Sequence, residues 1–173
     1  MKKTTTRKSP SAKKTTAPAA VRLARGDRAP DFTLADQAGR RVKLADFRGR
    51  KLLLYFYPKA DTPGCTVQSC AVRDAREDLA DRGVDVVGIS PDAPTAQAQF
   101  DRKHALTFPL LSDPDHATAS AYGAWGEKRN YGRTYEGIVR SSFLVDEDGR
   151  ISGAWYGVKP DATVPKALER LEA

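Results

Sequence analysis

The periodicity of apolar residues switches between strand-like and helix-like along the chain. Residues 32–34 and 41–44 alternate around a Gly-containing loop, which predicts a β-hairpin. A continuous apolar run at 52–56 is typical of a strand covered on both faces. Residues 62–82 carry apolar side chains at helical spacing, which predicts a helix that ends before a glycine at 83. The predicted apolar face of this helix comprises Val67, Ala71, Val72, Ala75 and Leu79.

The second half of the chain continues the alternation of strands and helices. Such an order predicts a mixed central sheet flanked by helices, and the fold class is therefore α/β. The last two strands are separated by a hairpin turn signal, so they are expected to pair antiparallel. The pattern predicts strands at 84–89 and 108–111, helices at 95–105 and 116–122, an irregular Gly-rich segment at 123–137, a strand pair at 139–145 and 151–156, and a closing helix at 160–171.

Charge is distributed unevenly between the N-terminal segment and the rest of the chain. The formal net charge is +7, from 29 basic and 22 acidic residues. Residues 1–25 contain eight of the 29 basic residues and no acidic one, which leaves 21 basic against 22 acidic residues in the remainder. This segment has too few large apolar residues to fold alone. We therefore expect a disordered basic tail at 1–24 and one folded domain at 25–173.

Three roles for the basic tail stay open. It fits a solvated terminus, a contact with nucleic acid or an anionic surface (or a nuclear address), or an organelle transit peptide. It lacks the apolar segment of a secretory signal, and no apolar run of the chain reaches ~18 residues. Two cysteines are too few for a disulfide framework. We expect a cytoplasmic protein without a membrane span, with an organelle or the nucleus as the alternative if the tail is a targeting segment.

The stretch from Tyr57 to Cys70 carries the residues with the clearest chemistry. It follows the apolar strand and holds both cysteines of the chain. Thr62 is predicted as the N-cap of the helix and Pro63 as its first residue, where a missing N–H costs nothing. Cys65 then lies at the third helical position, near free backbone N–H groups that favour a thiolate. This position predicts a nucleophilic cysteine.

The spacing of the two cysteines distinguishes between kinds of redox pair. Residues five apart on an α-helix have Cα atoms ~8.6 Å apart, which is beyond the ~7 Å limit for a disulfide. Cys65 and Cys70 can therefore bond only if the first turns of the helix unwind, and Gly64 weakens the helix there. A Cys-x-x-Cys exchanger needs no unwinding, so the chain is a poor match for that class. On these grounds alone, a role for Cys70 as a small buried residue stays open.

Other candidate chemistry is weaker. His104 and His116 do not have the spacing of zinc ligands relative to the cysteines, so no metal site is predicted. Several aromatic residues would suit a nucleic-acid stacking surface, but packing is the commoner role of aromatic side chains. These residues are Trp125, Tyr131, Tyr135, Trp155 and Tyr156.

The motif around the first cysteine resembles the active-site motif of the peroxiredoxins. The resemblance rests on Phe56-Tyr-Pro-Lys-Ala-Asp-Thr-Pro-Gly-Cys65-Thr and is closest to the bacterioferritin comigratory protein (PrxQ) branch. It begins at Ala29-Pro-Asp-Phe32 and continues through Cys70. Ala60 departs from the family, in which an acidic residue is common at this position. Two further matching motifs, in the same order and spacing, are Trp125–Gly132 and Thr134–Asp146.

The resemblance implies a thioredoxin-like fold with an N-terminal β-hairpin extension. It also implies thiol-dependent reduction of hydrogen peroxide and organic hydroperoxides without metal, haem or flavin. By the same resemblance, Cys65 is the peroxidatic cysteine and Cys70 the resolving cysteine, and the two join in an intramolecular disulfide. Thr62 hydrogen-bonds the peroxide, Pro58 shields the pocket and Arg140 is the active-site cation. From the strand pattern alone, Arg140 would instead be a surface residue.

The partners implied by the resemblance are a hydroperoxide substrate and a thioredoxin or similar dithiol reductant. Resolution within one chain needs no partner cysteine, so we expect a monomer. Nucleic acid would bind only through residues 1–25. A second class therefore stays open, namely a basic-tailed binding module on a redox-inert fold. Consumption of peroxide in the presence of a dithiol reductant would distinguish the two classes.

Overall fold

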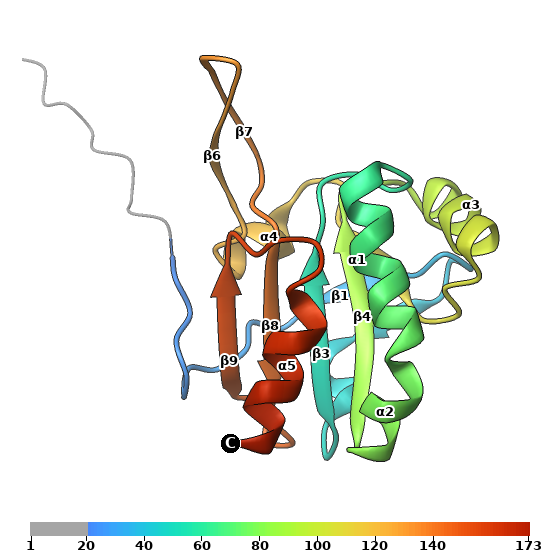
Figure 1. The fold of residues 1–173 in the computed structure, drawn as a ribbon, viewed down its shortest axis with the longest axis vertical. Coiled ribbons are helices and arrows are strands. Elements are labelled where there is room, and N and C mark those ends of the chain that lie inside the picture. The colour runs from blue at the N-terminus through green and yellow to red at the C-terminus, as the bar shows by residue number, and fades with distance from the viewer. Residues whose placement is uncertain (1–20) are drawn as a thin grey trace, which may run out of the picture.

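The computed structural model describes residues 21–173, which form a mixed seven-stranded sheet and a separate two-stranded hairpin (Figure 1). The order in the large sheet is β2-β1-β5-β4-β3-β8-β9. β4 is parallel to both β3 and β5, and the other neighbours pair antiparallel. The strands of the large sheet are β1 (Thr33–Ala35), β2 (Arg41–Lys43), β3 (Lys51–Phe56), β4 (Val84–Ser90), β5 (Leu110–Ser112), β8 (Ser141–Val145) and β9 (Ile151–Tyr156).

Helices cover both faces of the sheet. α1 (Pro63–Asp74), α2 (Arg76–Asp81) and α5 (Thr163–Glu172) lie in front of the strands in Figure 1, whereas α4 (Ala117–Ala121) lies behind them. α3 (Pro94–His104) contacts β5, and a 3₁₀ turn (Leu44–Phe47) follows β2. None of the helices in residues 21–173 has the length and apolar character needed to span a bilayer. The predicted α/β class and the N-terminal β-hairpin are confirmed.

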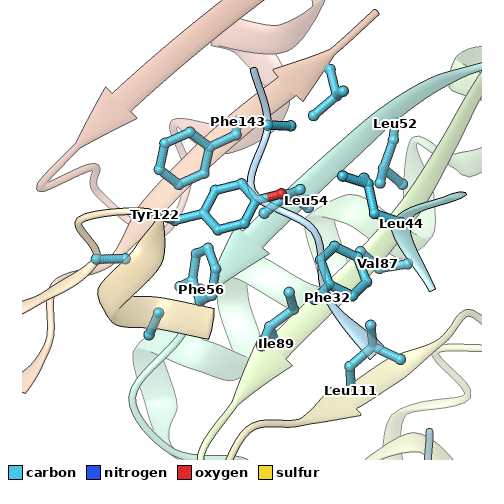
Figure 2. Packing of buried hydrophobic residues seen from close by; sticks show 14 of the residues in the cluster. Phe32, Leu44, Leu52, Leu54, Phe56, Val87, Ile89, Leu111, Tyr122 and Phe143 are labelled. Atoms are coloured by element: carbon cyan, nitrogen blue, oxygen red, sulfur yellow. The ribbon is translucent and has the colours of Figure 1, made fainter. Parts of the chain in front are cut away.

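The apolar run at 52–56 forms β3 because both of its faces are buried. Leu52, Leu54 and Phe56 point into one hydrophobic cluster, and Leu53 and Tyr55 into the other. Side chains alternate between faces along a strand, so a central strand needs apolar residues at every position. Figure 2 shows the first of these clusters, in which side chains from several strands meet an aromatic ring from the segment after α4.

The helix predicted at 62–82 is interrupted. Ala75 separates α1 from α2, and its N–H is shared between the carbonyl groups of Ala71 and Arg73. The predicted apolar face is also partly wrong, because Val67 is 51% exposed. The buried face of α1 instead contains two polar residues, Gln68 and Ser69, whose side chains find hydrogen-bond partners inside the domain.

The segment at 123–137, predicted to be irregular, forms a β-hairpin. β6 (Trp125–Asn130) pairs antiparallel with β7 (Arg133–Ile138), and the pair projects beyond the end of the large sheet (Figure 1). Tyr131 and Gly132 both have positive φ, as a two-residue type I′ turn requires. The prediction failed because most of these residues face water on both sides, so no apolar alternation marks the strands.

Element boundaries elsewhere agree with the predictions to within a few residues. β5 begins at Leu110 rather than at 108, and α5 begins at Thr163 rather than at 160. The basic tail falls mostly on residues 1–20, which lie outside the described residues. Residues 21–24 contact the domain, and the N–H of Leu23 donates to the hydroxyl of Tyr156 at 2.8 Å.

We expect substitution of Phe143 to be strongly destabilising. Its fully buried ring lies 5.9, 5.2 and 5.4 Å from the ring centroids of Phe56, Tyr122 and Tyr156. Phe143→Ala should therefore lower the free energy of unfolding by about 3–5 kcal/mol, measured by urea denaturation. The control is Tyr131→Ala, which removes a 99% exposed ring and should change it by no more than about 0.5 kcal/mol. Equal losses in the two variants would contradict this assignment of the core.

Candidate active site

The first turn of α1 places Cys65 where the sequence predicted it. Thr62 is the N-cap in an extended conformation, Pro63 is the first helical residue, and Cys65 is the third. The N–H groups of this turn have no partner within the helix, which makes the helix start electropositive. The sulfur is packed among apolar side chains on the α1 face of the sheet, and Cys65 is only 1% exposed.

Arg140 reaches Cys65 from the segment between β7 and β8. Its Nη2 lies 3.5 Å from Sγ of Cys65, and the residue is half-buried. A methyl group on Gly64 would lie 3.1 Å from Nη2 of Arg140 and 3.3 Å from Cγ of Pro160. A side chain at position 64 would therefore displace the guanidinium or Pro160 by a few tenths of an ångström, so the glycine favours the close approach of Arg140 to the helix start. The structure thus brings Arg140 to Cys65, which the strand pattern alone did not predict.

A chain of buried hydrogen bonds holds Arg140 in this position. Nη1 of Arg140 donates to Oε1 of Gln68 at 2.6 Å, and Nε2 of Gln68 donates to Oγ1 of Thr163 at 2.8 Å. Oγ1 of Thr163 lies 2.9 Å from Oγ of Ser142, so the chain ends inside the sheet. Gln68 was missed by the sequence analysis. The available signal was its position three residues after Cys65, which places both side chains on one helix face.

Thr62 and Pro58 lie in the loop between β3 and α1. The hydroxyl of Thr62 donates to the carbonyl group of Lys59 at 2.7 Å instead of capping the helix. A hydroxyl that donates one bond retains its acceptor lone pairs. Pro58 follows β3 and is half-buried.

Side chains from outside the loop hold it in place. Asp61 has a φ of 59°, and its carboxylate accepts hydrogen bonds from Lys103 at 2.8 Å and pairs with Nε2 of His104 at 3.0 Å. The N–H of Ala60 donates to the carboxylate of Asp92 at 2.7 Å. The loop is thus fixed by charged groups from α3 and from the turn between β4 and α3.

Cys70 lies on the same continuous helix as Cys65. Both thiols are free, and Cys70 is half-buried. Between them along the helix, the hydroxyl of Ser69 forms a hydrogen bond with Tyr55 at 2.8 Å. Burial raises the pKa of Tyr55 far above its usual range, so this phenol stays protonated. The two cysteines are therefore separated by an intact, hydrogen-bonded helix.

The other candidate side chains lie away from the thiols or in packing roles. Within residues 21–173, no cluster of three or more His, Cys, Asp and Glu side chains is arranged to hold a metal. His104 pairs with Asp61, and His116 stacks on Trp125 with the ring centroids 3.7 Å apart. Tyr156 packs against Phe143, whereas Tyr131 is almost fully exposed at the tip of the β6–β7 hairpin.

This arrangement is suited to nucleophilic chemistry at sulfur. The sulfur of Cys65 lies at a helix start and within hydrogen-bond distance of a guanidinium, and both groups can donate to an anionic sulfur or oxygen. No second nucleophile or base is needed for a thiolate to react with an electrophilic atom that can leave with negative charge.

Comparison with known proteins agrees with this chemistry. The model of the AhpC/TSA family matches residues 25–154. Peroxiredoxin Bcp of Escherichia coli K12 is 54% identical over 129 residues, which are 75% of this chain and 83% of that protein. A putative peroxiredoxin of Mycobacterium tuberculosis H37Rv is 54% identical over 146 residues, 84% of this chain and 93% of that protein. The solved bacterioferritin comigratory protein of Xanthomonas campestris has a TM-score of 0.79 and 31% identity, and the match covers 86% of this chain and 98% of that one.

The fold and the cysteine site define a thioredoxin-like, thiol-dependent peroxidase, and the chain belongs to the peroxiredoxins of the AhpC/TSA family. Within this family, it falls in the bacterioferritin comigratory protein (PrxQ) branch, as the resemblance of its motifs predicted. Its substrate is therefore a hydroperoxide and its reductant a thiol.

The ion pairs of Asp61 predict a pH dependence of stability. Hydrogen bonds from Lys103, and to a smaller extent from His104, lower the pKa of Asp61 below the usual value of an aspartate. A lowered pKa in the folded state stabilises the protein above the unfolded pKa, and this contribution is lost as the pH falls through the folded pKa. Wild type should thus be more stable than Asp61→Asn at pH 7, and the difference should vanish toward pH 2.

Urea denaturation at the two pH values measures this difference. Asn tolerates positive φ, so the substitution removes the charge without a backbone penalty. Asp81→Asn, which removes an exposed carboxylate at the end of α2 far from the loop, is the control at both pH values. If the difference in unfolding free energy between wild type and Asp61→Asn is the same at pH 7 and pH 2, the charge of Asp61 does not contribute to stability.

Proposed function

We propose that Cys65 is the peroxidatic cysteine and that Arg140 is the catalytic cation beside it. The observation that carries this proposal is the 3.5 Å separation between Sγ of Cys65 and Nη2 of Arg140 at the start of α1. The membership of the chain in the peroxiredoxins supports it, because that activity requires a reactive thiol.

The first step is attack of the Cys65 thiolate on the terminal oxygen of the hydroperoxide. The S–O bond forms while the O–O bond breaks, and the bonding pair leaves on the other oxygen, which takes up a proton as water or an alcohol. The sulfur is oxidised to sulfenic acid and the peroxide is reduced. Arg140 and the free N–H groups near Gly64 stabilise the negative charge that develops on the departing oxygen.

Thr62 and Pro58 complete the proposed site. Because the hydroxyl of Thr62 donates to the carbonyl group of Lys59, it is oriented to accept a hydrogen bond from the hydroperoxide. Pro58 lies at the end of β3, where an apolar ring limits the access of water to the sulfur.

Resolution requires the helix to open. Cys70 is five residues from Cys65 within α1, so their Cα atoms are ~8.6 Å apart in an intact helix, beyond the reach of a disulfide. In the proposed second step, the first turns of α1 unwind and the Cys70 thiolate attacks the sulfenic sulfur, which releases water. The intramolecular disulfide is then reduced by a thioredoxin-type dithiol through a mixed disulfide.

The remaining parts of the proposal follow from this cycle. Both cysteines belong to one chain, so a monomer is sufficient for turnover. The Xanthomonas protein is described by its alkyl peroxide reduction activity, which supports organic hydroperoxides as substrates here. Residues 1–24 remain a proposed basic tail outside the catalytic domain at 25–173.

Single cysteine substitutions test the two thiol roles. Cys65→Ser should abolish peroxidase turnover with a thioredoxin reductant, because no other residue forms the sulfenic acid. Cys70→Ser should react once with peroxide and then keep a sulfenic acid that dimedone traps and mass spectrometry detects. Unchanged steady-state turnover in Cys70→Ser would refute the resolving role, whereas full turnover in Cys65→Ser would refute the whole assignment.

Substitution of Arg140 tests transition-state stabilisation. Arg140→Ala should slow the reaction of Cys65 with hydrogen peroxide by about 10²-fold or more. Its reaction with a neutral alkylating agent, in which no oxygen leaves, should slow much less. Arg133→Ala, which removes an exposed cation from β7, is the matched control and should change neither rate. Equal losses on both reagents would mean that Arg140 acts only on ionisation of the thiol.

A further inference from the structure

A groove runs along β9, the edge strand of the large sheet. The N-terminal end of the described chain lies beside this strand, and α5 lies in front of it (Figure 1). Two adjoining hollows of about 560 and 620 Å³ lie between these three segments. Both hollows are lined by Ala154, Trp155 and Lys166, so together they form one groove, which we call the β9 groove.

Basic side chains line the β9 groove. Five cations contribute to it, from the N-terminal segment, the loop after β9 and α5, and one acidic side chain, that of Glu169, accompanies them. Within residues 21–173, none of the five forms a salt bridge with a carboxylate, and residues 1–20 contain no acidic residue that could supply one. The groove therefore carries positive charge that the protein itself does not neutralise. The five cations are Arg22, Arg25, Lys159, Lys166 and Arg170.

Contacts within the protein hold two of these cations at the groove. The guanidinium of Arg22 lies over the ring of Tyr156, 4.6 Å from its centroid, which is a cation–π contact. Nε of Arg170 donates to the carbonyl group of Ser152 at 2.6 Å. A guanidinium has several N–H donors, so Arg170 keeps others for a ligand. These two cations are therefore positioned before any ligand binds.

An aromatic ring completes the β9 groove. Trp155 lines both hollows, and its indole covers Gly153, where a Cβ would clash with the ring. Trp155 is half-buried, so part of it remains accessible from the groove. Cations that follow a phosphate backbone, together with an aromatic ring on which a base can stack, are typical of proteins that bind single-stranded nucleic acid. A membrane surface, by contrast, cannot enter a groove between a strand and a helix.

We propose that the β9 groove binds single-stranded nucleic acid, with its cations on the phosphate groups and Trp155 against a base. A flexible single strand can follow the groove, whereas duplex DNA, with a persistence length of ~50 nm, is too stiff to bend into it. The basic residues at 1–20 directly precede Arg22 in the sequence, and their charge attracts the same ligand. The site thus extends beyond residues 1–25, to which the sequence analysis confined nucleic-acid binding, and it is independent of the chemistry of Cys65.

Binding of an oligothymidylate to the full chain tests the proposal. The probe is a fluorescein-labelled strand of about 20 nucleotides, long enough for one groove, and fluorescence anisotropy at several salt concentrations gives the affinity. A double variant with Arg25→Gln and Lys166→Gln should bind about tenfold more weakly. It should also lower the slope of log affinity against log salt by about 1.4, since each lost phosphate contact removes about 0.7.

A matched double variant at the opposite edge of the sheet is the control. Arg41→Gln with Lys43→Gln also removes one arginine and one lysine, from exposed positions on β2, and should leave the affinity and the salt slope close to their wild-type values. Equal losses in the two double variants would show that general charge attracts the strand, and would overturn the proposal. Cys65→Ser should bind like wild type, so failure of the peroxidase assignment would leave this inference intact.

Tryptophan fluorescence locates the bound strand. Trp125→Phe leaves Trp155 as the single tryptophan of the chain, and unlabelled oligothymidylate should quench its emission. Binding without quenching would place the strand on residues 1–20 alone and would overturn the role of the groove. No binding at all, or tighter binding to vesicles of phosphatidylglycerol than to the oligothymidylate, would also overturn the proposal.

Discussion

One chain of buried hydrogen bonds governs the geometry of the active site. Arg140 donates a hydrogen bond to Gln68, Gln68 donates one to Thr163, and the hydroxyl of Thr163 hydrogen-bonds that of Ser142. The side chains of Gln68, Thr163 and Ser142 are buried. Buried polar groups are costly to leave unpaired, so these partners are held together. Gln68 lies on the helix that carries Cys65, whereas its partners lie on or beside the sheet. A single hydrogen-bond network therefore stabilises the folded form of α1 and also fixes the position of the Arg140 guanidinium.

Much of the fold could be predicted because, in most elements, the apolar residues are the buried ones and the residues at the helix start are those that favour it. Thr62 and Pro63 mark the start of α1, and the apolar run of β3 fits a strand buried on both faces. The failures occur where burial does not follow apolarity. Gln68 is buried and Val67 exposed, because a hydrogen-bonded amide occupies the inner face of α1. The β6–β7 hairpin carries no apolar alternation, since it packs little against the core.

The candidate site was predictable to the extent that it is local. Cys65 follows from its place in one helical turn, which the sequence specifies directly. Arg140 lies 75 residues away, and only the pairing of β8 with β3 brings it to the sulfur. The family resemblance identified Arg140, but periodicity could not. Gln68 was missed because its importance arises from partners on distant elements, namely Arg140 and Thr163.

The interruption at Ala75 limits how much of the domain must move during catalysis. α2 packs on β4 and buries Leu79, whereas α1 contacts α5. Segments that are separated in this way can open independently, at a free energy below that of global unfolding. In the proposed cycle, α1 can therefore unfold locally while α2 stays packed on β4. The thiol pair would then lie in the one segment that rearranges, so that oxidation remodels α1 and leaves the sheet unchanged.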